Sequence, residues 1–142
     1  MERFTDFWCF RVGVLSRKIQ RYYNQRYADY GITVGQSFVL FDLLDHGDSS
    51  VKDIAKRVQL DSPAVTGFID RLSKEGYVER REDPNDRRIV QVSLTPNGRK
   101  LAECIFPIAQ EYHDHLKDLL AVDEATLFDQ LMRKLEAELE SQ

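Results

Sequence analysis

The sequence predicts a mainly α-helical fold that carries one small β-hairpin. Apolar side chains recur at helical spacing through most of the 142 residues, as at Trp8, Val12 and Leu15. Residues 77–81 and 89–94 have the pattern of short strands, and the second alternates with a period of two. No run approaches the roughly 20 apolar residues that a membrane-spanning helix needs. The chain is therefore expected to fold as a globular protein with no membrane segment.

Local start and stop signals place the elements of the N-terminal half. One long helix is expected over residues 4–30, ending at Gly31. Thr33 and Gln36 have the spacing of a capping box, which predicts that the next helix starts there and ends at Gly47.

Two short helices and the hairpin follow. Ser50 is expected to cap a helix over residues 51–58, and Ser62 followed by Pro63 to open the next, which Gly76 ends. The remaining elements are expected in this order: a strand over 77–81, a turn over 82–86, a strand over 89–94, a helix from Thr95-Pro96 to about 120 with a bend near Pro107, and a last helix from Asp123.

The first helix has two apolar faces, and two faces need two partners. We interpret the smaller face as a contact between subunits, the alternative being a helix buried in the core. The larger face carries Phe4, Trp8, Val12, Leu15, Ile19, Tyr22 and Tyr23, and the smaller one Phe7, Phe10 and Val14. Residues 1–32 and 96–142 are accordingly predicted to be dimerisation helices around a central module, 33–95.

The two short helices have the pattern of a helix-turn-helix. Ala55 is small enough for the helices to approach closely, and Leu60 is expected to fill the turn. The inward stripe of the second helix is predicted to comprise Val65, Phe68, Ile69 and Leu72. Small groups and then cations lie on the outward face, which suits the major groove of double-stranded DNA. That face carries Pro63, Thr66, Gly67, Asp70, Arg71 and Lys74, with Ser62 at the helix start, where a phosphate can bind. A plain amphipathic core helix is the alternative.

The hairpin concentrates arginine. Arg80, Arg81, Arg87 and Arg88 lie on its flanks and tip, and arginine side chains gain from the negative potential of a narrow minor groove. Asp86 is placed to orient Arg88. Although the net charge is -4, residues 50–100 hold 11 Lys and Arg against 8 Asp and Glu. A basic reading module on an acidic scaffold fits sequence-selective binding to DNA, whereas simple solvation of the charges is the alternative.

The run IAKRVQLDSPAVTGFIDRLSKEGYVERREDPNDRRIVQVSLTPNGRKL, residues 54–101, closely resembles the MarR family of bacterial regulators. The resemblance implies a winged helix-turn-helix in a dimer whose terminal helices interlock and whose two modules read a pseudo-palindrome. It implies that Ser62, Thr66, Gly67 and Arg71 meet the major groove. It also implies that Asp86 and Arg88 match the Asp-x-Arg of the wing, with Arg87 between them. One departure is Gln59, where many such turns have glycine; a positive φ there would cost about 1 kcal/mol.

The same resemblance implies release from DNA by a small ligand, often aromatic, bound between the dimerisation helices and the module. We expect a repressor whose effector is an aromatic or acidic molecule or its CoA thioester. Arg11 is the predicted anchor, because a guanidinium beside aromatic rings can bind a carboxylate through two hydrogen bonds; the alternative is an ion pair with the partner subunit. The predicted pocket comprises Trp8, Arg11, Val12, Leu15, Tyr23 and Phe38.

Other functions have weaker support. Cys9 resembles the cysteine of the branch that senses organic hydroperoxides, but no Lys or His lies near enough in sequence to stabilise its thiolate, so an incidental cysteine is expected. His113 and His115 point apart on a helix and predict no metal site. No nucleophile-base pair or phosphate loop is found, and we expect neither an enzyme nor a cofactor. A winged-helix module for protein contacts is a further alternative. Without a signal peptide or disulfide framework, the expected location is the cytoplasm.

Overall fold

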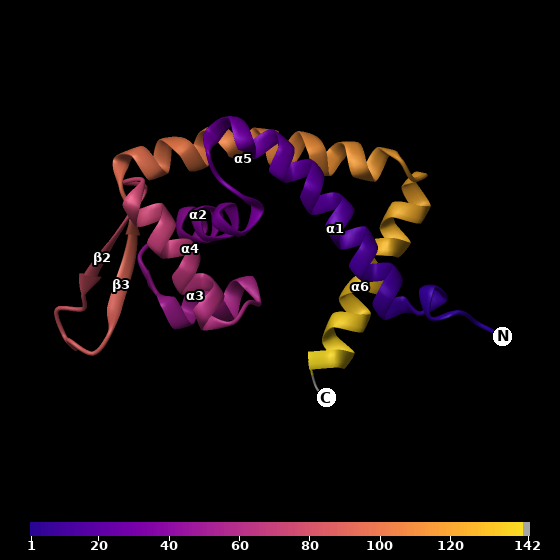
Figure 1. Ribbon diagram of the computed structural model, residues 1–142, viewed down its shortest axis with the longest axis horizontal. Coiled ribbons are helices and arrows are strands. Elements are labelled where there is room, and N and C mark those ends of the chain that lie inside the picture. Colours follow the sequence, from indigo (N-terminus) through magenta and orange to yellow (C-terminus); the bar gives the residue numbers. More distant parts are fainter. Residues whose placement is uncertain (141–142) are drawn as a thin grey trace. The chain divides into compact units, whose positions relative to one another are not determined.

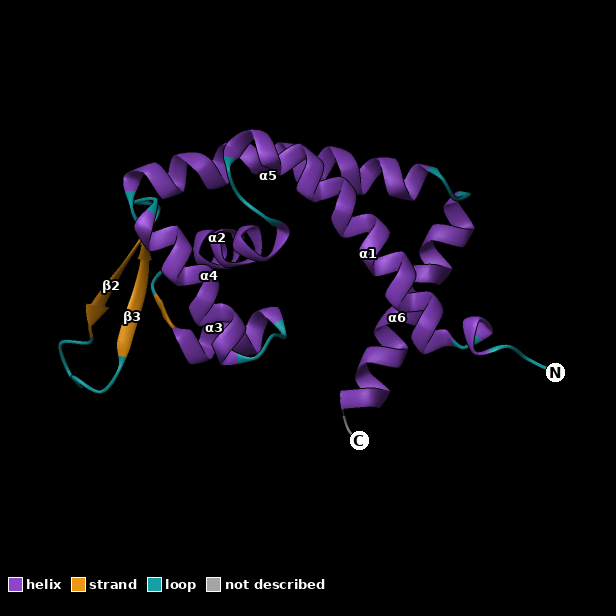
Figure 2. Cartoon of the chain, in the orientation of Figure 1, coloured by secondary structure: helices purple, strands orange, loops and turns teal. Residues whose placement is uncertain are grey.

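The predicted mainly helical fold with a small sheet is present in the structure, a computed structural model that describes residues 1–140. Figure 1 shows the elements along the chain, and Figure 2 distinguishes the helices in purple, the strands in orange and the loops in teal. In chain order they are η1 Phe4–Asp6, α1 Trp8–Tyr27, η2 Ala28–Tyr30, α2 Val34–His46, β1 Ser49–Ser50, α3 Val51–Val58, α4 Ser62–Lys74, β2 Val78–Glu82, β3 Val90–Leu94, α5 Pro96–Asp118 and α6 Val122–Glu140.

The prediction of one helix over residues 4–30 is wrong at both ends. The first turn is a separate 3-10 helix, because the Asp6 carboxylate accepts a hydrogen bond from the Arg3 backbone N–H at 3.2 Å and Phe7 is extended, with φ -69° and ψ 142°. The last turn is again a 3-10 helix, which ends at Gly31 as predicted, in the left-handed region with φ 70°. Periodicity alone could not reveal either break, since the apolar spacing runs through both.

Helices α2, α3 and α4 pack around a shared apolar core. Ile54 and Ala55 of α3 and Val65, Ile69 and Leu72 of α4 are buried, as the sequence predicts. Burial of each Val, Ile or Leu side chain among them contributes about 1.5–3 kcal/mol. The core is completed by side chains from α2, the sheet and the start of α5: Val39, Leu40, Leu43, Val78, Val92, Ala102 and Ile105.

Two glycines are needed where elements approach closely. A Cβ on Gly35 would collide with the ring of Phe68, so the absence of a side chain lets α4 lie against the first turn of α2. A Cβ on Gly98 would collide with the carbonyl oxygen of Tyr77, so α5 begins directly against the chain that leaves α4. Neither contact could be read from local periodicity.

The sheet has three antiparallel strands in the order β1-β3-β2. Both hairpin strands lie within one residue of their predicted bounds, and Val78 of β2 pairs with Leu94 of β3. The third strand, β1, was not predicted, because two residues cannot show a period of two. Its residue Ser49 pairs with Val92 and joins the wing to the start of α3.

The helix caps agree with the sequence in three of four cases, one of them Thr95, whose Oγ1 accepts a hydrogen bond from the Gly98 N–H at 3.0 Å at the start of α5. Thr33 and Gln36 form the predicted capping box of α2, and Ser50 accepts a hydrogen bond from the Asp53 N–H at the start of α3. The predicted cap of α4 is wrong. Asp61, and not Ser62, is the N-cap, and its carboxylate accepts from the Ala64 N–H at 2.8 Å. A carboxylate at the N-cap also complements the positive end of the helix dipole.

The chain divides into two compact units, the first from Met1 to Phe106 and the second beginning at Pro107. Helix α5 continues through Pro107, so the bend predicted there stays a prediction. In the second unit, α6 buries none of its described residues. No helix among residues 1–140 combines the length and apolar character needed to cross a membrane.

Candidate nucleic-acid interface

Helix α4 separates a buried face from an exposed face as the sequence predicts. Ser62 and all six residues of the predicted outward face are exposed, while Val65, Ile69 and Leu72 are at most 1% exposed. A Cβ on Gly67 would meet nothing within 4 Å, so no contact inside the chain requires glycine at that position. The outward face is therefore open for a large partner.

The turn between α3 and α4 places Gln59 at a positive φ, a backbone conformation that is strained for any residue with a side chain. Gln59 ends α3 in the left-handed region, with φ 60° and ψ 41°. Its side-chain Nε2 donates to the Lys56 carbonyl at 3.1 Å, which recovers part of a strain of about 1 kcal/mol. The expectation that Leu60 fills the turn is wrong, because this side chain is 37% exposed.

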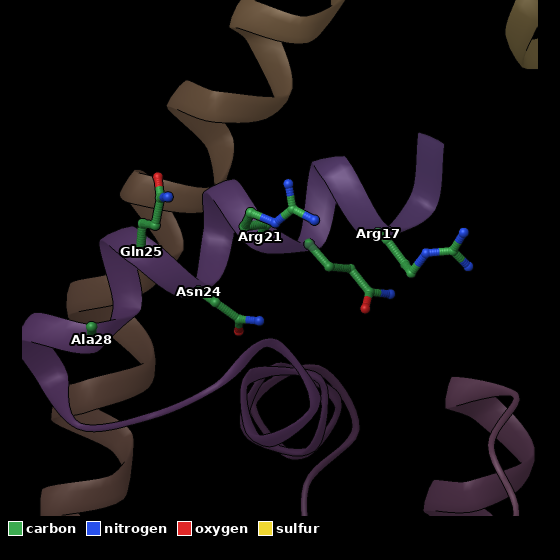
Figure 3. A pocket seen from close by; sticks show the side chains of 6 residues that line it. Arg17, Arg21, Asn24, Gln25 and Ala28 are labelled. Carbon is green, nitrogen blue, oxygen red and sulfur yellow. The ribbon is translucent and has the colours of Figure 1, made fainter. Parts of the chain in front are cut away.

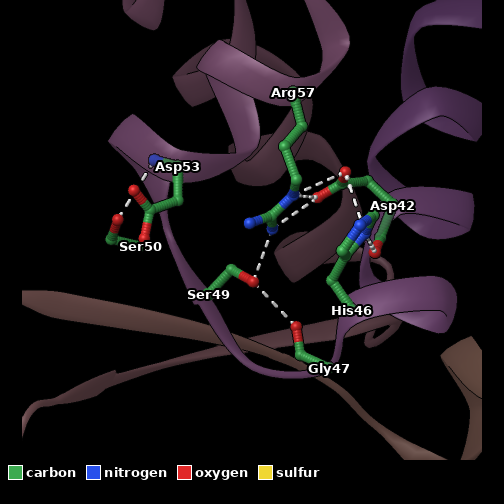
Figure 4. Close-up of polar contacts among 7 residues, drawn as sticks. All are labelled: Asp42, His46, Gly47, Ser49, Ser50, Asp53 and Arg57. Carbon is green, nitrogen blue, oxygen red and sulfur yellow. Dashed lines mark hydrogen bonds and ion pairs between the residues drawn. The ribbon is translucent and has the colours of Figure 1, made fainter.

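A part-buried ion pair that the sequence analysis missed fixes α3 in place (Figure 4). The Asp42 carboxylate of α2 accepts from Arg57 Nε at 2.9 Å and from Arg57 Nη2 at 2.8 Å, and its side chain is 5% exposed. Arg57 Nη2 also donates to Ser49 Oγ at 2.6 Å. The hydrogen bonds to Asp42 raise the pKa of Arg57. An acid within the apolar run of α2 was the signal that could have revealed the pair.

The pair has one further neighbour. Nδ1 of His46 lies 3.1 Å from the Asp42 carbonyl oxygen and 3.5 Å from the Asp42 carboxylate. Ser49 in turn donates to the Gly47 carbonyl at 2.9 Å. Polar groups from α2, β1 and α3 thus hold the first helix of the helix-turn-helix against the sheet that carries the wing.

At the wing, Asp86 contacts Arg88 as expected. The carboxylate accepts from the Arg88 N–H and Nε, both at 3.0 Å, and from Nη2 at 3.1 Å. These hydrogen bonds lower the pKa of Asp86 and raise that of Arg88. The Arg88 side chain is nonetheless 89% exposed, and Arg87 beside it is exposed too. The loop thus presents oriented guanidinium charge to the solvent.

The two other arginines of the hairpin have acidic partners. Arg80 donates to Asp70 of α4, a contact that the sequence analysis did not predict. Arg81 donates to Glu79 of the same strand at 3.0 Å. The recognition-type helix and the first strand of the wing are therefore joined by an ion pair.

The residues predicted to bind an effector lie along α1 and α2. Trp8, Val12 and Leu15 are 71%, 63% and 45% exposed, and Arg11 is exposed as well. Phe38 of α2 is 39% exposed. Tyr23 is half-buried, with its ring centroid 5.8 Å from that of Tyr27. The exposure of both faces of α1 within this chain argues against the alternative of a buried core helix.

A polar hollow lies further along α1 than the predicted pocket (Figure 3). It has a volume of about 530 Å³ and is lined by Arg17, Gln20, Arg21, Asn24, Gln25 and Ala28. The Asn24 side chain accepts from the Val34 N–H at 2.8 Å and so holds the start of α2. Two guanidinium groups beside carboxamides can bind an anion. The sequence analysis missed this hollow because it searched for arginine next to aromatic residues.

The remaining reactive side chains form no assembled centre in the described part of the chain. Cys9 and Cys104 are free and exposed, and a hydrogen bond to Cys104 raises the pKa of Tyr30. His115 stacks on Tyr112, with ring centroids 6.2 Å apart. Over residues 1–140 no group of three His, Cys, Asp or Glu is arranged to hold a metal ion.

Comparison with known proteins decides the family. The model of the MarR family matches residues 32–90. The multiple antibiotic resistance protein MarR of Salmonella typhimurium is 32% identical over 123 residues, which cover 86% of this chain and 85% of that protein. The chain belongs to the MarR family.

Solved structures agree with this membership. BpsR of Bordetella bronchiseptica, described with the mechanism by which 6-hydroxynicotinic acid regulates its DNA binding, superposes with a TM-score of 0.88 at 29% identity, covering 96% of this chain and 97% of that one. A mutant MarR of E. coli complexed with operator DNA gives 0.85 at 28% identity, covering 95% and 99%. As a MarR-family protein, the chain is a DNA-binding transcriptional regulator with a winged helix-turn-helix, and not an enzyme.

Proposed function

We propose that the protein is a homodimeric repressor that binds a pseudo-palindromic operator and releases it when a small aromatic or acidic effector binds. The observation that carries the proposal is the exposed face of α4 next to an exposed, oriented Arg88. Small groups at the start of that face permit close approach to base edges, and cations follow further along. The similarity to a structure with operator DNA supports the same placement.

Each part of the surface then has a role. In the major groove, the proposed contacts come from Ser62, Pro63, Thr66, Gly67, Asp70, Arg71 and Lys74, and in the minor groove from Arg87 and Arg88, with Asp86 orienting Arg88. Residues 1–32 and 96–142 supply the dimer contacts. The apolar stripe of α6 supports that assignment: Phe128, Leu131, Met132, Leu135 and Leu139 are 38–71% exposed in the single chain.

The wing assignment is tested with Arg88→Ala. We expect weaker binding to duplexes of any sequence and a salt dependence whose slope falls by about one, because one phosphate-region contact is lost. Fluorescence anisotropy of a duplex enriched by repeated selection measures both quantities. Arg26→Ala, which removes an exposed arginine from α1, is the matched control and should bind like wild type. Unchanged affinity of Arg88→Ala at physiological salt contradicts the wing assignment.

We propose an aromatic acid or its CoA thioester as the effector. BpsR, whose DNA binding responds to 6-hydroxynicotinic acid, supports this ligand class. Two anchors compete for the carboxylate: Arg11 with its aromatic neighbours, and the pair Arg17 and Arg21 in the polar hollow. Both lie on α1, and Asn24 of the hollow accepts from the Val34 N–H, so a ligand in the hollow can affect the contact between α1 and the start of α2.

A thermal-shift screen with aromatic acids, starting from 6-hydroxynicotinic acid, identifies ligands, because binding to the native state raises its stability. Arg11→Ala should then abolish release from DNA while DNA binding persists. Loss of release in Arg17→Ala or Arg21→Ala alone would move the anchor to the hollow. Cys9→Ser should leave release by the acid unchanged, whereas loss of a peroxide response in that variant would favour an oxidant sensor.

A further inference from the structure

Asp70 is an acid in the middle of the face that α4 turns to DNA in the proposed function. Thr66 and Gly67 precede it by one helical turn, and Lys74 follows by another, so all four share one exposed face. A carboxylate without a partner at this place would repel phosphates and weaken binding to every sequence. Its presence therefore needs a compensating charge.

The sheet supplies that charge through Arg80. Side chains two apart on a strand share a face, so Arg80 leaves β2 on the same side as Val78, which is 2% exposed. Arg80 also lies opposite the fully buried Val92 of β3. From there its guanidinium Nη2 donates to Asp70 Oδ1. The two side chains stay 36% and 51% exposed, so DNA can reach the pair.

The neighbouring pair Glu79 and Arg81 provides an internal comparison. These residues lie on the other face of β2, away from α4, and their side chains are 52% and 69% exposed. Their hydrogen bond stays within one strand and fixes no element to another. The pair Asp70–Arg80 differs because it joins the recognition helix to the first strand of the wing.

We propose that Asp70 is a positioning residue that sets the DNA selectivity of the protein through Arg80. By accepting a hydrogen bond from Arg80, Asp70 holds the planar guanidinium beside α4, where that group can recognise a base edge. Asp70 also neutralises a positive charge that would otherwise attract any phosphate. Exposed ion pairs contribute little to stability, so the effect is expected in selectivity and not in folding. The inference rests on the proposed function, because it needs α4 at the DNA.

The test is a double-mutant cycle of wild type, Asp70→Asn, Arg80→Gln and the double variant, with affinities measured for a selected duplex and a scrambled duplex at several salt concentrations. We expect Asp70→Asn to tighten binding to the scrambled duplex, to steepen its salt slope by about one and to lower the ratio of specific to non-specific affinity by about tenfold. With Arg80→Gln already present, Asp70→Asn should tighten binding to both duplexes alike, because it removes an unpartnered carboxylate that repels phosphate, and should leave the ratio of specific to non-specific affinity unchanged.

Glu79→Gln is the matched control, because it releases Arg81 by the same chemistry on the other face of β2; it should leave the affinity ratio unchanged. An equal fall of the affinity ratio on Asp70→Asn in both backgrounds would mean that Asp70 acts without Arg80, and would overturn the inference. An unchanged ratio in Asp70→Asn would overturn it too. If wild type bound neither duplex even in dilute salt, the proposed function itself would fail, which is a distinct result.

Discussion

The winged module buries its large apolar side chains, whereas helix α6 exposes its own. Leu40 and Ile69 of the module are fully buried, whereas Leu131 and Leu135 of α6 are 49% and 47% exposed. Burial of each side chain contributes a few kcal/mol, about 1.5–3 for leucine. The module therefore obtains this stabilisation from contacts within its own chain. The apolar side chains of α6 would obtain it only on burial against another surface, which the proposed dimer would provide.

The largest effect is expected inside the module. Asp42→Ala leaves Arg57 without its carboxylate partner, and should lower the free energy of unfolding by about 2–4 kcal/mol, somewhat less than for a fully buried pair because Arg57 is 30% exposed. Urea unfolding measures the change. His46→Gln, which alters the 50% exposed neighbour of Asp42, is the control and should change little. If Asp42→Ala were as stable as wild type, the ion pair between Asp42 and Arg57 would not contribute to the stability of the module.

A smaller effect of another kind is expected on α6. Leu131→Glu places a charge on the exposed apolar stripe and should weaken dimerisation at least about tenfold, which corresponds to 1.4 kcal/mol. Sedimentation across a dilution series measures the dissociation constant. Glu136→Gln on the same helix is the control. If Leu131→Glu were as dimeric as wild type, α6 would not supply the contact and the contrast with the module would lose its explanation.

The module also contains a local strain that can be relieved. Gln59→Gly removes a side chain from a residue with φ 60° and should raise the free energy of unfolding by about 1 kcal/mol. The same substitution at Gln20, inside α1, should lower it by a similar amount of about 1 kcal/mol, since glycine disfavours regular helix. Thermal or urea unfolding separates the two signs. A loss of stability in Gln59→Gly would show that the side-chain bond to Lys56 outweighs the strain.

The smallest effect is expected at the wing, where Asp86 is half-buried and its partner Arg88 is 89% exposed. The pKa of Asp86 is lowered, so the stabilising contact with Arg88 is present above the carboxyl's ordinary pKa and is lost as the pH falls through the lowered value. NMR titration of the Asp86 carboxyl carbon follows this step. In Arg88→Ala the pKa should return toward its ordinary value; the same pKa in both proteins would mean that Arg88 is not its cause.

The elements of the module could be predicted because their signals are local. The capping box of Thr33 and Gln36, the cap at Ser50 and the alternating apolar pattern of residues 89–94 in the sequence each lie within a few residues. The outward face of α4 followed from helical spacing and is exposed as expected. Its role at DNA stays a prediction.

Contacts between distant residues could not be predicted in the same way. Asp42 and Arg57 are 15 residues apart, and Asp70 and Arg80 are 10 apart, and nothing in the local pattern states which acid meets which base. The break between the two helices at Phe7 could not be predicted either, because the apolar residues keep their helical spacing across its extended backbone. Polar partnership across elements depends on packing, which periodicity only implies.

One glycine has a consequence for how this module can change. Gly67 lies mid-helix with open space around its missing side chain, so alanine there would make the isolated protein more stable by about 1 kcal/mol. In the proposed complex the same methyl group would meet the base edges of the groove. Stability of the free protein thus favours alanine at this position, whereas binding to the operator favours glycine. Selection of variants for thermal stability alone would therefore yield a more stable protein that binds its operator less well.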